Sequence, residues 1–488
     1  MISDMFEKVT EDVVARLRAI VGAEHVAVAD IEKYGHDETE DFWFPPEAVV
    51  RPRTAAEVSQ VMRLATERRI PVTPQAARTS LSGGALPVHG GIALSVERMN
   101  RILEVDAENL FVVTEPGVIT QVLQEEVEKR GLFYGPDPAS RGSCMIGGNI
   151  AHNAGGPRAL KYGVTKDWVY GLQVVLPGGD VIRTGGKLLK NVTGYNLTQL
   201  IVGSEGTLGI VTEAILKLIP KPRFNKTMLA PFGSVVAAAT AVTRIFQAQI
   251  IPCACEYMER SAVEAAERRK GQQFPGSAGA AAMLLVEVDG NDEGLCEKDI
   301  ERIAEICMEC GAPDVFLATD EEKRASIWAM RRSIGEAVKA LSAYREEDTV
   351  VPRVKLPALI EAIHDVSKRH GIQAISYGHI GDGNIHVNLL RMGLSDDEWA
   401  RKLDPAVKEL FERTLALGGQ ITGEHGVGFV QRNYLKMAYP PHQIELMRQL
   451  KRVFDPAGIL NPGKVLPDEA GVSIAERHRH RATVGGGA

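Results

Sequence analysis

Three glycine-rich clusters in the first half of the chain constrain its fold most strongly. They are Thr79-Ser80-Leu81-Ser82-Gly83-Gly84, then Gly147-Gly148-Asn149 with Asn153-Ala154-Gly155-Gly156, and then Gly203-Ser204-Glu205-Gly206-Thr207-Leu208-Gly209. Segments rich in β-forming residues, such as 110–114 and 172–176, run between them. Loops of this kind expose backbone N–H groups with few side chains in the way, which suits a pyrophosphate. The clusters therefore indicate a long, phosphate-containing cofactor.

The two best-known nucleotide motifs do not fit these clusters. The spacing Gly203-x-x-Gly206-x-x-Gly209 differs from Gly-x-Gly-x-x-Gly, and residues 210–218 predict a strand where a dinucleotide fold needs a helix. Gly186-Lys187 is followed by Leu188, whereas a P-loop needs Ser or Thr at that position. The sequence therefore supports neither a Rossmann fold nor a P-loop.

Local patterns predict mixed helix and strand throughout. A helix is expected over 10–22, and Thr54-Ala55-Ala56-Glu57 forms a capping box that opens a helix to about Arg69, with strands on either side of it. After Pro220-Lys221-Pro222, helices at about 233–248, 259–269 and 293–311 alternate with strands such as 282–288, typical of an α+β domain. A chain of 488 residues exceeds one core, so two or three domains are expected.

The stretch from Ser376 to Asn388 carries candidate metal ligands. Asn384, His386 and Asn388 alternate at a period of two, so a strand would point all three to one face. The turn signal Gly381-Asp382-Gly383 lets a hairpin bring His379 back beside His386.

A second glycine-rich segment, at 423–428, offers Glu424 and His425. Two histidines and a glutamate suit an open, catalytic divalent-metal site. In the other interpretation, the two loops are unrelated and their histidines cap backbone groups.

Composition excludes several classes of protein. The net charge of −7 argues against a nucleic-acid surface, and no run of 18 apolar residues indicates a membrane span. Six cysteines and no signal-peptide pattern favour the cytoplasm. Cys307-x-x-Cys310 and Cys253-x-Cys255 have metal-ligand spacing, but the first lies in an amphipathic helical pattern and no iron–sulfur array is present, so structural roles are favoured.

Six motifs in order resemble the FAD-linked D-2-hydroxyacid dehydrogenases. They are the three glycine clusters, Pro136-Asp137-Pro138-Ala139-Ser140, Lys161-Tyr162-Gly163 and the His379–His386 stretch, within a resemblance that covers about 45–465. That family includes D-lactate and D-2-hydroxyglutarate dehydrogenases and the FAD subunit of glycolate oxidase. The resemblance implies an α+β chain with a bipartite vanillyl-alcohol-oxidase-type FAD-binding domain and an α+β substrate-binding cap domain.

The resemblance also implies domain limits. We expect the FAD-binding domain at 1–222, the cap with the metal site at 223–452, a segment at 453–470 that returns to the FAD domain, and a flexible tail at 471–488. The returning segment contains Phe454-Asp455-Pro456, and Asn461-Pro462-Gly463-Lys464 resembles the family's closing motif.

The family's motifs place non-covalent FAD on a set of loop residues. These are Arg78, Thr79, Ser80, Leu81, Ser82, Gly83, Pro136, Asp137, Ser140, Gly147, Gly148, Asn149, Asn153, Gly155, Gly156, Tyr162, Gly163, Glu205, Gly206, Gly209, Ile210 and Asn461. Three departures stand out. Arg78 replaces a glycine, which predicts a looser turn and a guanidinium near phosphate. Met145 replaces a threonine. His152 offers a covalent bond to the flavin as a less favoured alternative to non-covalent binding.

In the family, basic residues of the cap face the substrate carboxylate. By position these are Arg331, three residues after Trp328, and Arg353, in the strand expected at Val351-Pro352-Arg353, with Lys355 a weaker candidate. Asn384 is expected either to support the metal ligands or to contact the substrate. Any of the basic residues could instead be an exposed surface charge.

Oxidation of a 2-hydroxyacid removes the hydroxyl proton and moves the C2 hydrogen, as hydride, to flavin N5. An alcohol has a pKa of about 16 and histidine about 6.5, a gap that costs roughly 12 kcal/mol. A divalent Zn, Mn or Fe ion on His379, His386 and Glu424 lowers the hydroxyl pKa by several units, which leaves His425 as the general base.

The sequence therefore predicts an FAD-dependent dehydrogenase of a small D-2-hydroxyacid, with D-lactate as first candidate. The alternatives are a glycolate oxidase subunit, a non-redox alkylglycerone-phosphate synthase, whose signature lacks the histidine cluster, and a flavin-free metal-binding module. The expected electron acceptor is a quinone, an electron-transferring flavoprotein or an iron–sulfur subunit. We expect a homodimer or complex subunit in the cytoplasm, with peripheral attachment at the inner face of the membrane left open.

Overall fold

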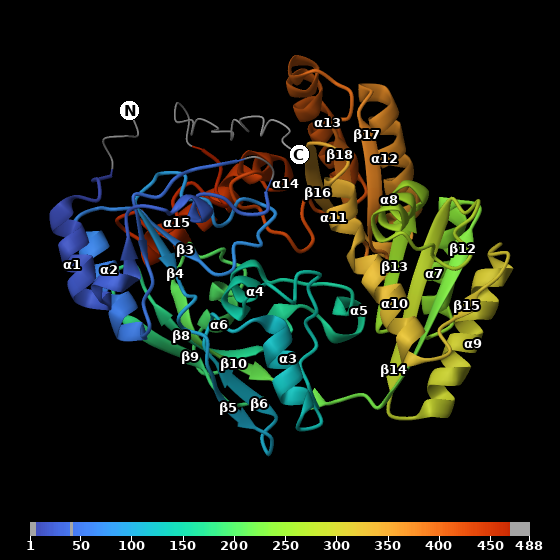
Figure 1. Cartoon of the computed structure of the whole chain (residues 1–488), viewed down its shortest axis with the longest axis horizontal. Helices are drawn as coiled ribbons and strands as arrows, with labels where there is room; N and C mark the ends of the chain where they lie inside the picture. Colours follow the sequence, from blue (N-terminus) through green and yellow to red (C-terminus); the bar gives the residue numbers. More distant parts are fainter. Residues whose placement is uncertain (1–5, 40–41, 469–488) are drawn as a thin grey trace, which may run out of the picture.

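The computed structural model describes residues 6–39 and 42–468, arranged in two parts that lie side by side (Figure 1). The first part contains a four-stranded and a five-stranded sheet, and the second is built on one seven-stranded sheet. The predicted tail at 471–488 lies outside the described residues.

The four-stranded sheet has a parallel centre with one antiparallel edge strand. Thr54 caps the helix after the second strand by accepting from the Glu57 N–H at 3.2 Å, as the capping box predicted. The sheet order is β1 (Val26–Ala27), β2 (Ala48–Val50), β4 (Ile92–Ser95), β3 (Val72–Gln75), with helices α1 (Glu11–Val21) and α2 (Ala55–Glu67) packed on it.

The five-stranded sheet is antiparallel and confirms that residues 210–217 form a strand instead of a helix. Its order is β5 (Ile102–Asp106), β6 (Phe111–Thr114), β10 (Ile210–Lys217), β8 (Val169–Val175), β9 (Val181–Gly185). The remaining elements of this part are α3 (Thr120–Glu128), α4 (Ile146–His152), α5 (Ala159–Tyr162), α6 (Leu197–Ile201), the pair β7 (Leu132–Phe133) and β11 (Ile219–Pro220), and 3-10 turns η1 (Ala23–His25), η2 (Glu32–Tyr34) and η3 (Thr165–Asp167).

The seven-stranded sheet is antiparallel throughout. Its order is β15 (Phe316–Leu317), β12 (Phe224–Phe232), β14 (Ala282–Gly290), β13 (Ala254–Glu259), β17 (Gln373–His379), β18 (Asn384–Leu390), β16 (Tyr344–Val350). The predicted helices at 233–248, 259–269 and 293–311 are confirmed, each within a few residues.

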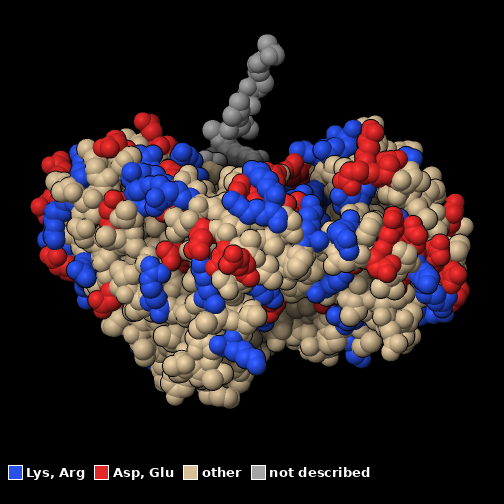
Figure 2. Space-filling model, turned by 90° about the horizontal axis from the view of Figure 1, so that it is seen from below, with Lys and Arg blue, Asp and Glu red and all other residues tan. Residues whose placement is uncertain are grey.

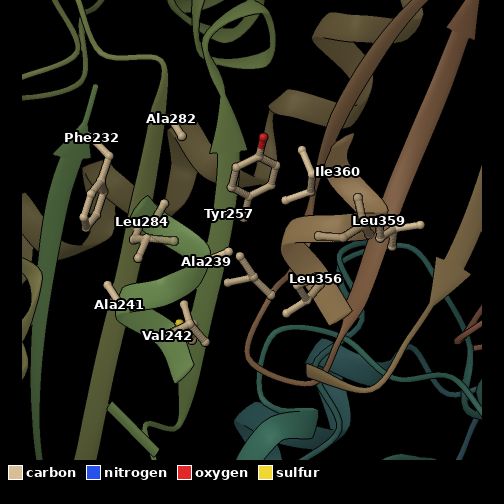
Figure 3. Close-up of a cluster of buried hydrophobic side chains, with 14 of the residues drawn as sticks. Phe232, Ala239, Ala241, Val242, Tyr257, Ala282, Leu284, Leu356, Leu359 and Ile360 are labelled. Atoms are coloured by element: carbon tan, nitrogen blue, oxygen red, sulfur yellow. The ribbon is translucent and has the colours of Figure 1, made fainter. Parts of the chain in front are cut away.

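Helices cover both faces of this sheet. One face packs on α7 (Val235–Gln247), α9 (Glu293–Glu309), α12 (Leu356–His370) and α13 (Asp396–Ala416). Figure 3 shows part of that contact, where Leu284 and Tyr257 of the sheet lie near Val242 of α7 and Ile360 of α12. The other face packs on α8 (Arg260–Lys270), α10 (Glu321–Arg332) and α11 (Ile334–Lys339).

The predicted hairpin between the two histidines is confirmed. β17 and β18 pair in a register that sets His379 opposite Asn384 and His386 opposite Tyr377. Gly383 adopts a φ of 94°, and a Cβ there would lie 2.1 Å from the Val351 carbonyl oxygen, so the turn requires glycine.

The last described segment returns to the first part of the molecule. After η5 (Arg432–Tyr434), α14 (Leu435–Ala438) and α15 (Pro441–Phe454), Val72 donates its N–H to the Ile459 carbonyl at 2.8 Å, and Asn461 donates back to Val72 at 2.7 Å. Within the described ranges, no helix is long and apolar enough to cross a membrane. On the face drawn in Figure 2, acidic and basic side chains intermingle instead of forming one basic field.

Candidate active site

A cavity of about 570 Å³ lies between the two parts of the molecule. Loops of the first part form one wall, including all three glycine clusters. The other wall comes from α10, α11, strands β16 to β18 and the Glu424–His425 loop. This volume and its two-sided wall suit an elongated ligand that spans both parts.

Many of the predicted cofactor residues line this cavity. They are Arg78, Thr79, Ser80, Leu81, Ser140, Gly147, Gly148, Asn149, Gly155, Glu205, Gly206, Gly209 and Ile210. Met145 and His152, the other two departures from the family pattern, also line it.

The other predicted cofactor residues do not line the cavity. Asn461 donates to the carbonyls of Gly84 at 3.1 Å and Glu205 at 2.8 Å, and so ties two glycine clusters together. The remaining residues of this set are Ser82, Gly83, Pro136, Asp137, Asn153, Gly156, Tyr162 and Gly163. Of these, Asp137 pairs with Arg332 at 2.7 Å and Tyr162 donates to Asp289 at 2.8 Å.

Arg78 adopts the left-handed backbone conformation that glycine favours, with a φ of 60°. Its guanidinium lies 4.6 Å from the centre of the Tyr34 ring, a cation–π contact. The looser turn expected at this position stays a prediction.

The hairpin brings the predicted metal ligands together. One atom each of His379, His386 and Glu424 lies within 4.8 Å of the others. Glu424 Oε1 is 3.2 Å from His379 Nε2 and 3.5 Å from His386 Nε2. His386 also belongs to a second such group, with Glu346 and His425.

A buried carboxylate orients the first histidine. His379 donates from Nδ1 to Glu256 of β13, at 2.8 and 3.0 Å, which turns Nε2 toward Glu424. Carboxylates hold metal-ligating histidines in this way. The three ligand side chains, together with the Glu256 carboxylate that orients His379, therefore fit a divalent ion.

The charges of the cluster also favour a cation. Burial alone would lower the pKa of His379, but Glu256 and Glu424 raise it well above its usual value. Burial and neighbouring His425 lower the pKa of His386 to about 4, which keeps that ring neutral. Burial would raise the pKa of Glu424, yet the three imidazoles hold it far below its usual range. A cation can replace the proton that His379 holds between two carboxylates.

Asp348 of β16 anchors the loop that carries Glu424 and His425. The carboxylate is buried and accepts from the Thr422 hydroxyl at 2.9 Å and from Asn384 at 2.6 Å. It also accepts from three consecutive backbone N–H groups at 2.8 to 2.9 Å, those of Gly423, Glu424 and His425.

The backbone of His425 is held on both sides while its ring faces the cavity. Its N–H bonds to Asp348, and its carbonyl accepts from the Ser82 hydroxyl at 3.0 Å and His152 Nδ1 at 2.9 Å. Its ring stacks on His386, with centroids 4.9 Å apart. The imidazole is thus positioned beside the proposed metal ligands with its main chain fixed.

The glycine clusters meet this loop directly. Glu205 accepts from the N–H groups of Val427 at 2.8 Å and Gly428 at 2.7 Å. A Cβ on Gly155 would lie 2.6 Å from Glu424 Oε2, so a larger residue there would displace the Glu424 carboxylate from its place in the cluster. The two walls therefore form one site.

The residues predicted to bind the substrate carboxylate do not all lie at the cavity. Arg331 lies in the cavity wall, buried, with one amino group on Glu256 and with an Nε that has no hydrogen-bond partner among the described residues. Arg353 and Lys355 do not join it. They are exposed on a 3-10 turn, η4 (Arg353–Lys355), where we expected a strand, and Arg353 lies on the Phe246 ring. Asn384 donates from its amide to Asp348 and does not line the cavity.

Several site residues escaped the sequence interpretation. Glu256, Glu346, Asp348, Arg332 and Lys339 come from elements distant in sequence from the hairpin. A signal did exist in β16, where Arg345-Glu346-Glu347-Asp348 contains three consecutive carboxylates; Glu347 and Asp348 are buried, and the Glu346 side chain is 6% exposed. Buried, unexposed carboxylates at such a density mark a functional site.

Comparison with known proteins identifies the family. Residues 46–185 match the FAD binding domain and residues 221–465 match the C-terminal domain of FAD linked oxidases. Glycolate oxidase subunit GlcD of Bacillus subtilis (strain 168) is 43% identical over 95% of this chain and 98% of that protein. D-lactate dehydrogenase of Anaerostipes hadrus is 36% identical over 94% and 98%, and D-2-hydroxyglutarate dehydrogenase of Stutzerimonas stutzeri (strain A1501) is 35% identical over 89% and 94%.

Solved structures share the fold. p-Cresol methylhydroxylase with substrate bound superposes with a TM-score of 0.75 at 17% identity, over 93% of this chain and 96% of that one. An alkyldihydroxyacetonephosphate synthase gives 0.72 at 19%, over 94% and 86%. At these identities the likeness shows the fold alone, which is the predicted vanillyl-alcohol-oxidase type. Together with the family matches, these findings show that the chain belongs to the FAD-linked oxidases and is an FAD-dependent oxidoreductase.

Proposed function

We propose that this enzyme oxidises a small 2-hydroxyacid to the 2-oxoacid, with D-lactate the first candidate and glycolate the second. The observation that carries the proposal is the contact between the glycine clusters and the His379–His386–Glu424 cluster in one cavity. Relatives named for D-lactate, glycolate and D-2-hydroxyglutarate, aligned over most of their lengths, support the same class of substrate.

FAD would lie along the three glycine clusters, and a Zn, Mn or Fe ion would lie on His379, His386 and Glu424. When bound, the flavin accepts the hydrogen and two electrons that leave C2, and the ion makes the substrate hydroxyl more acidic. The neutral ring of His386 and the anionic Glu424 leave lone pairs available for that ion.

His425 takes the hydroxyl proton in this proposal. Its Nε2 lies 3.9 Å from Glu424 Oε1, close to the ligand set but outside it. Because its backbone is held by Asp348, Ser82 and His152, the ring needs little reorganisation to receive the proton. Asn384 contributes by holding Asp348.

Arg331 binds the substrate carboxylate in this proposal. It is the one predicted cation of the clamp that lines the cavity, and its buried Nε has no hydrogen-bond partner among the described residues. An arginine that fixes the carboxylate restricts which C2 hydrogen faces the flavin loops, which is how we expect the D enantiomer to be selected.

The electrons leave to an acceptor other than a nicotinamide. The sequence has no iron–sulfur cysteine array, so we expect the acceptor to be external to this chain. A quinone, an electron-transferring flavoprotein and an iron–sulfur subunit are the candidates. Identity of 43% to a protein named as a subunit supports assembly into a complex.

Anaerobic reduction of the purified flavoprotein tests the proposal. D-lactate, L-lactate, glycolate and D-2-hydroxyglutarate are each added, and the flavin absorbance is followed. We expect D-lactate or glycolate to bleach the flavin and L-lactate to leave it oxidised. Photoreduction serves as the control that the flavin can be reduced. A flavin that photoreduces but responds to none of the four acids contradicts the proposal.

A further inference from the structure

Each of three cations in the cap side of the cavity wall pairs with a carboxylate. Arg331 pairs with Glu256, and Arg332 with Asp137. The third pair joins Lys339, in the last turn of α11, to Glu346 of β16 at 3.1 Å. None of the three cations therefore stands as a bare positive charge.

The Lys339–Glu346 pair lies directly beside the proposed metal ligands. Glu346 Oε1 is 3.9 Å from His386 Nδ1, while the Nε2 of the same ring faces Glu424. Both members of the pair line the cavity, and the Glu346 side chain is only 6% exposed. A substituent on substrate C2 that extends past His386 meets this pair.

The Lys339–Glu346 pair is neutral as a whole. Its ammonium group is already paired with a carboxylate, so a second substrate carboxylate placed beside the pair would bury an uncompensated negative charge, which is strongly unfavourable.

Two arginine nitrogen atoms of this wall, Arg331 Nε and Arg332 Nη1, have no hydrogen-bond partner in the described part of the chain, but both are buried, so a carboxylate reaches them only if the side chains move. Lys339 is ion-paired with Glu346. A second carboxylate at the far end of the substrate would be repelled by Glu346, and this repulsion offsets its attraction to Lys339.

We propose that the Lys339–Glu346 pair makes the site selective for monocarboxylic 2-hydroxyacids against dicarboxylic ones. The selectivity comes from Glu346, which cancels the cation that a second carboxylate would need. This inference rests on the proposed oxidation of a 2-hydroxyacid and deepens it by naming the substrate class.

Glu346→Gln tests the selectivity in the holoenzyme. The measured quantity is the ratio of kcat/KM for D-2-hydroxyglutarate to that for D-lactate within one protein, which cancels any change in metal content. We expect the ratio to rise about tenfold or more, because Lys339 becomes available to the distal carboxylate. Adding Lys339→Gln to the same variant should return the ratio to within about threefold of the parent value.

Glu336→Gln is the matched control. Glu336 also lines the cavity and lies on α11, but its side chain is 75% exposed and pairs with surface Arg269, so the same loss of charge should leave the ratio unchanged. As a readout independent of turnover, pyruvate and 2-oxoglutarate are titrated against the oxidised flavin absorbance in every variant, and the ratio of the two Kd values should shift in the same direction.

Two results would overturn the inference. One is a parent enzyme that prefers D-2-hydroxyglutarate, and the other is an unchanged ratio in Glu346→Gln, by turnover and by product binding. If D-lactate still bleaches the flavin in those cases, the proposed oxidation stands and only the selectivity fails. If no hydroxyacid bleaches the parent flavin, the oxidation itself fails.

Discussion

Removal of the Asp348 carboxylate is the most direct test of how the site is held together. Asp348→Ala deletes the acceptor of three backbone N–H groups in the Glu424–His425 loop, together with the bonds from Thr422 and Asn384. Asp348→Asn keeps the shape and one acceptor oxygen but removes the charge. The two variants therefore separate the contribution of the charge from that of the contact.

The expected magnitude follows from the hydrogen bonds that are lost. A hydrogen bond to a charged group contributes about 1.5 to 3 kcal/mol, and bonds to one atom are not additive. For Asp348→Asn we expect a loss of about 2 to 4 kcal/mol in transition-state stabilisation, which is roughly 30- to 1,000-fold in rate. Asp348→Ala should lie at or beyond the upper end of that range.

Stopped-flow flavin reduction by D-lactate under anaerobic conditions measures this effect. FAD content should stay near stoichiometric, because Asp348 lies on β16 in the cap part and does not line the cavity. Thr422→Val is the milder comparison, since it removes one hydroxyl bond to the same carboxylate and should cost about tenfold or less. An Asp348→Ala protein that reduces its flavin at the parent rate would refute the anchoring role.

Four further predictions concern the remaining groups. His425→Ala should retain FAD but reduce it orders of magnitude more slowly, and unchanged single-turnover reduction would remove His425 from the mechanism. Treatment with a chelator should abolish reduction by substrate while the flavin spectrum persists, and added Zn, Mn or Fe should restore it; full activity in a protein shown to be metal-free contradicts the metal site. Arg331→Ala should raise KM at least about tenfold, whereas Arg353→Ala, on the exposed turn, should change it less than about threefold; equal effects would contradict the placement. Burial lowers the pKa of His89 to about 4, so below pH 6.5 the unfolded chain binds a proton at this histidine more readily than the folded protein does. The free energy of unfolding should therefore fall by up to about 3 kcal/mol between pH 6.5 and 4. In denaturant titrations, His89→Gln should lose this part of the pH dependence of the free energy of unfolding, and an unchanged pH dependence contradicts the prediction.

The hairpin and the helix start could be predicted from the sequence because their signals lie in residues that are adjacent in the chain. The period of two in Asn384-Ile385-His386-Val387-Asn388 and the preceding Gly-Asp-Gly turn predicted the hairpin, and Thr54 with Glu57 predicted the start of α2. The order of strands in the seven-stranded sheet could not be predicted from the sequence. β13 pairs with β17 across more than a hundred residues, and only that pairing brings Glu256 to His379.

The expected substrate clamp failed in part for a similar reason. Pro352 follows β16 and the chain turns into a 3-10 turn, which carries Arg353 outward onto Phe246. Nothing in the spacing distinguishes this turn from two further residues of strand. In the same strand, three adjacent carboxylates would ordinarily indicate a solvent face, but Glu346, Glu347 and Asp348 are buried because a sheet edge here closes against the Glu424 loop and not against water.

The Glu424–His425 loop is fastened from both parts of the molecule, by Asp348 from the cap and by Glu205 from a glycine cluster. A hinge motion that parted the two halves would break the Glu205 bonds and loosen the base along with them. We therefore expect substrate to enter and product to leave through the mouth of the cavity while the halves stay closed. The turnover rate would then be limited by the chemical step or by diffusion through the cavity mouth, and no lid motion would be rate-limiting.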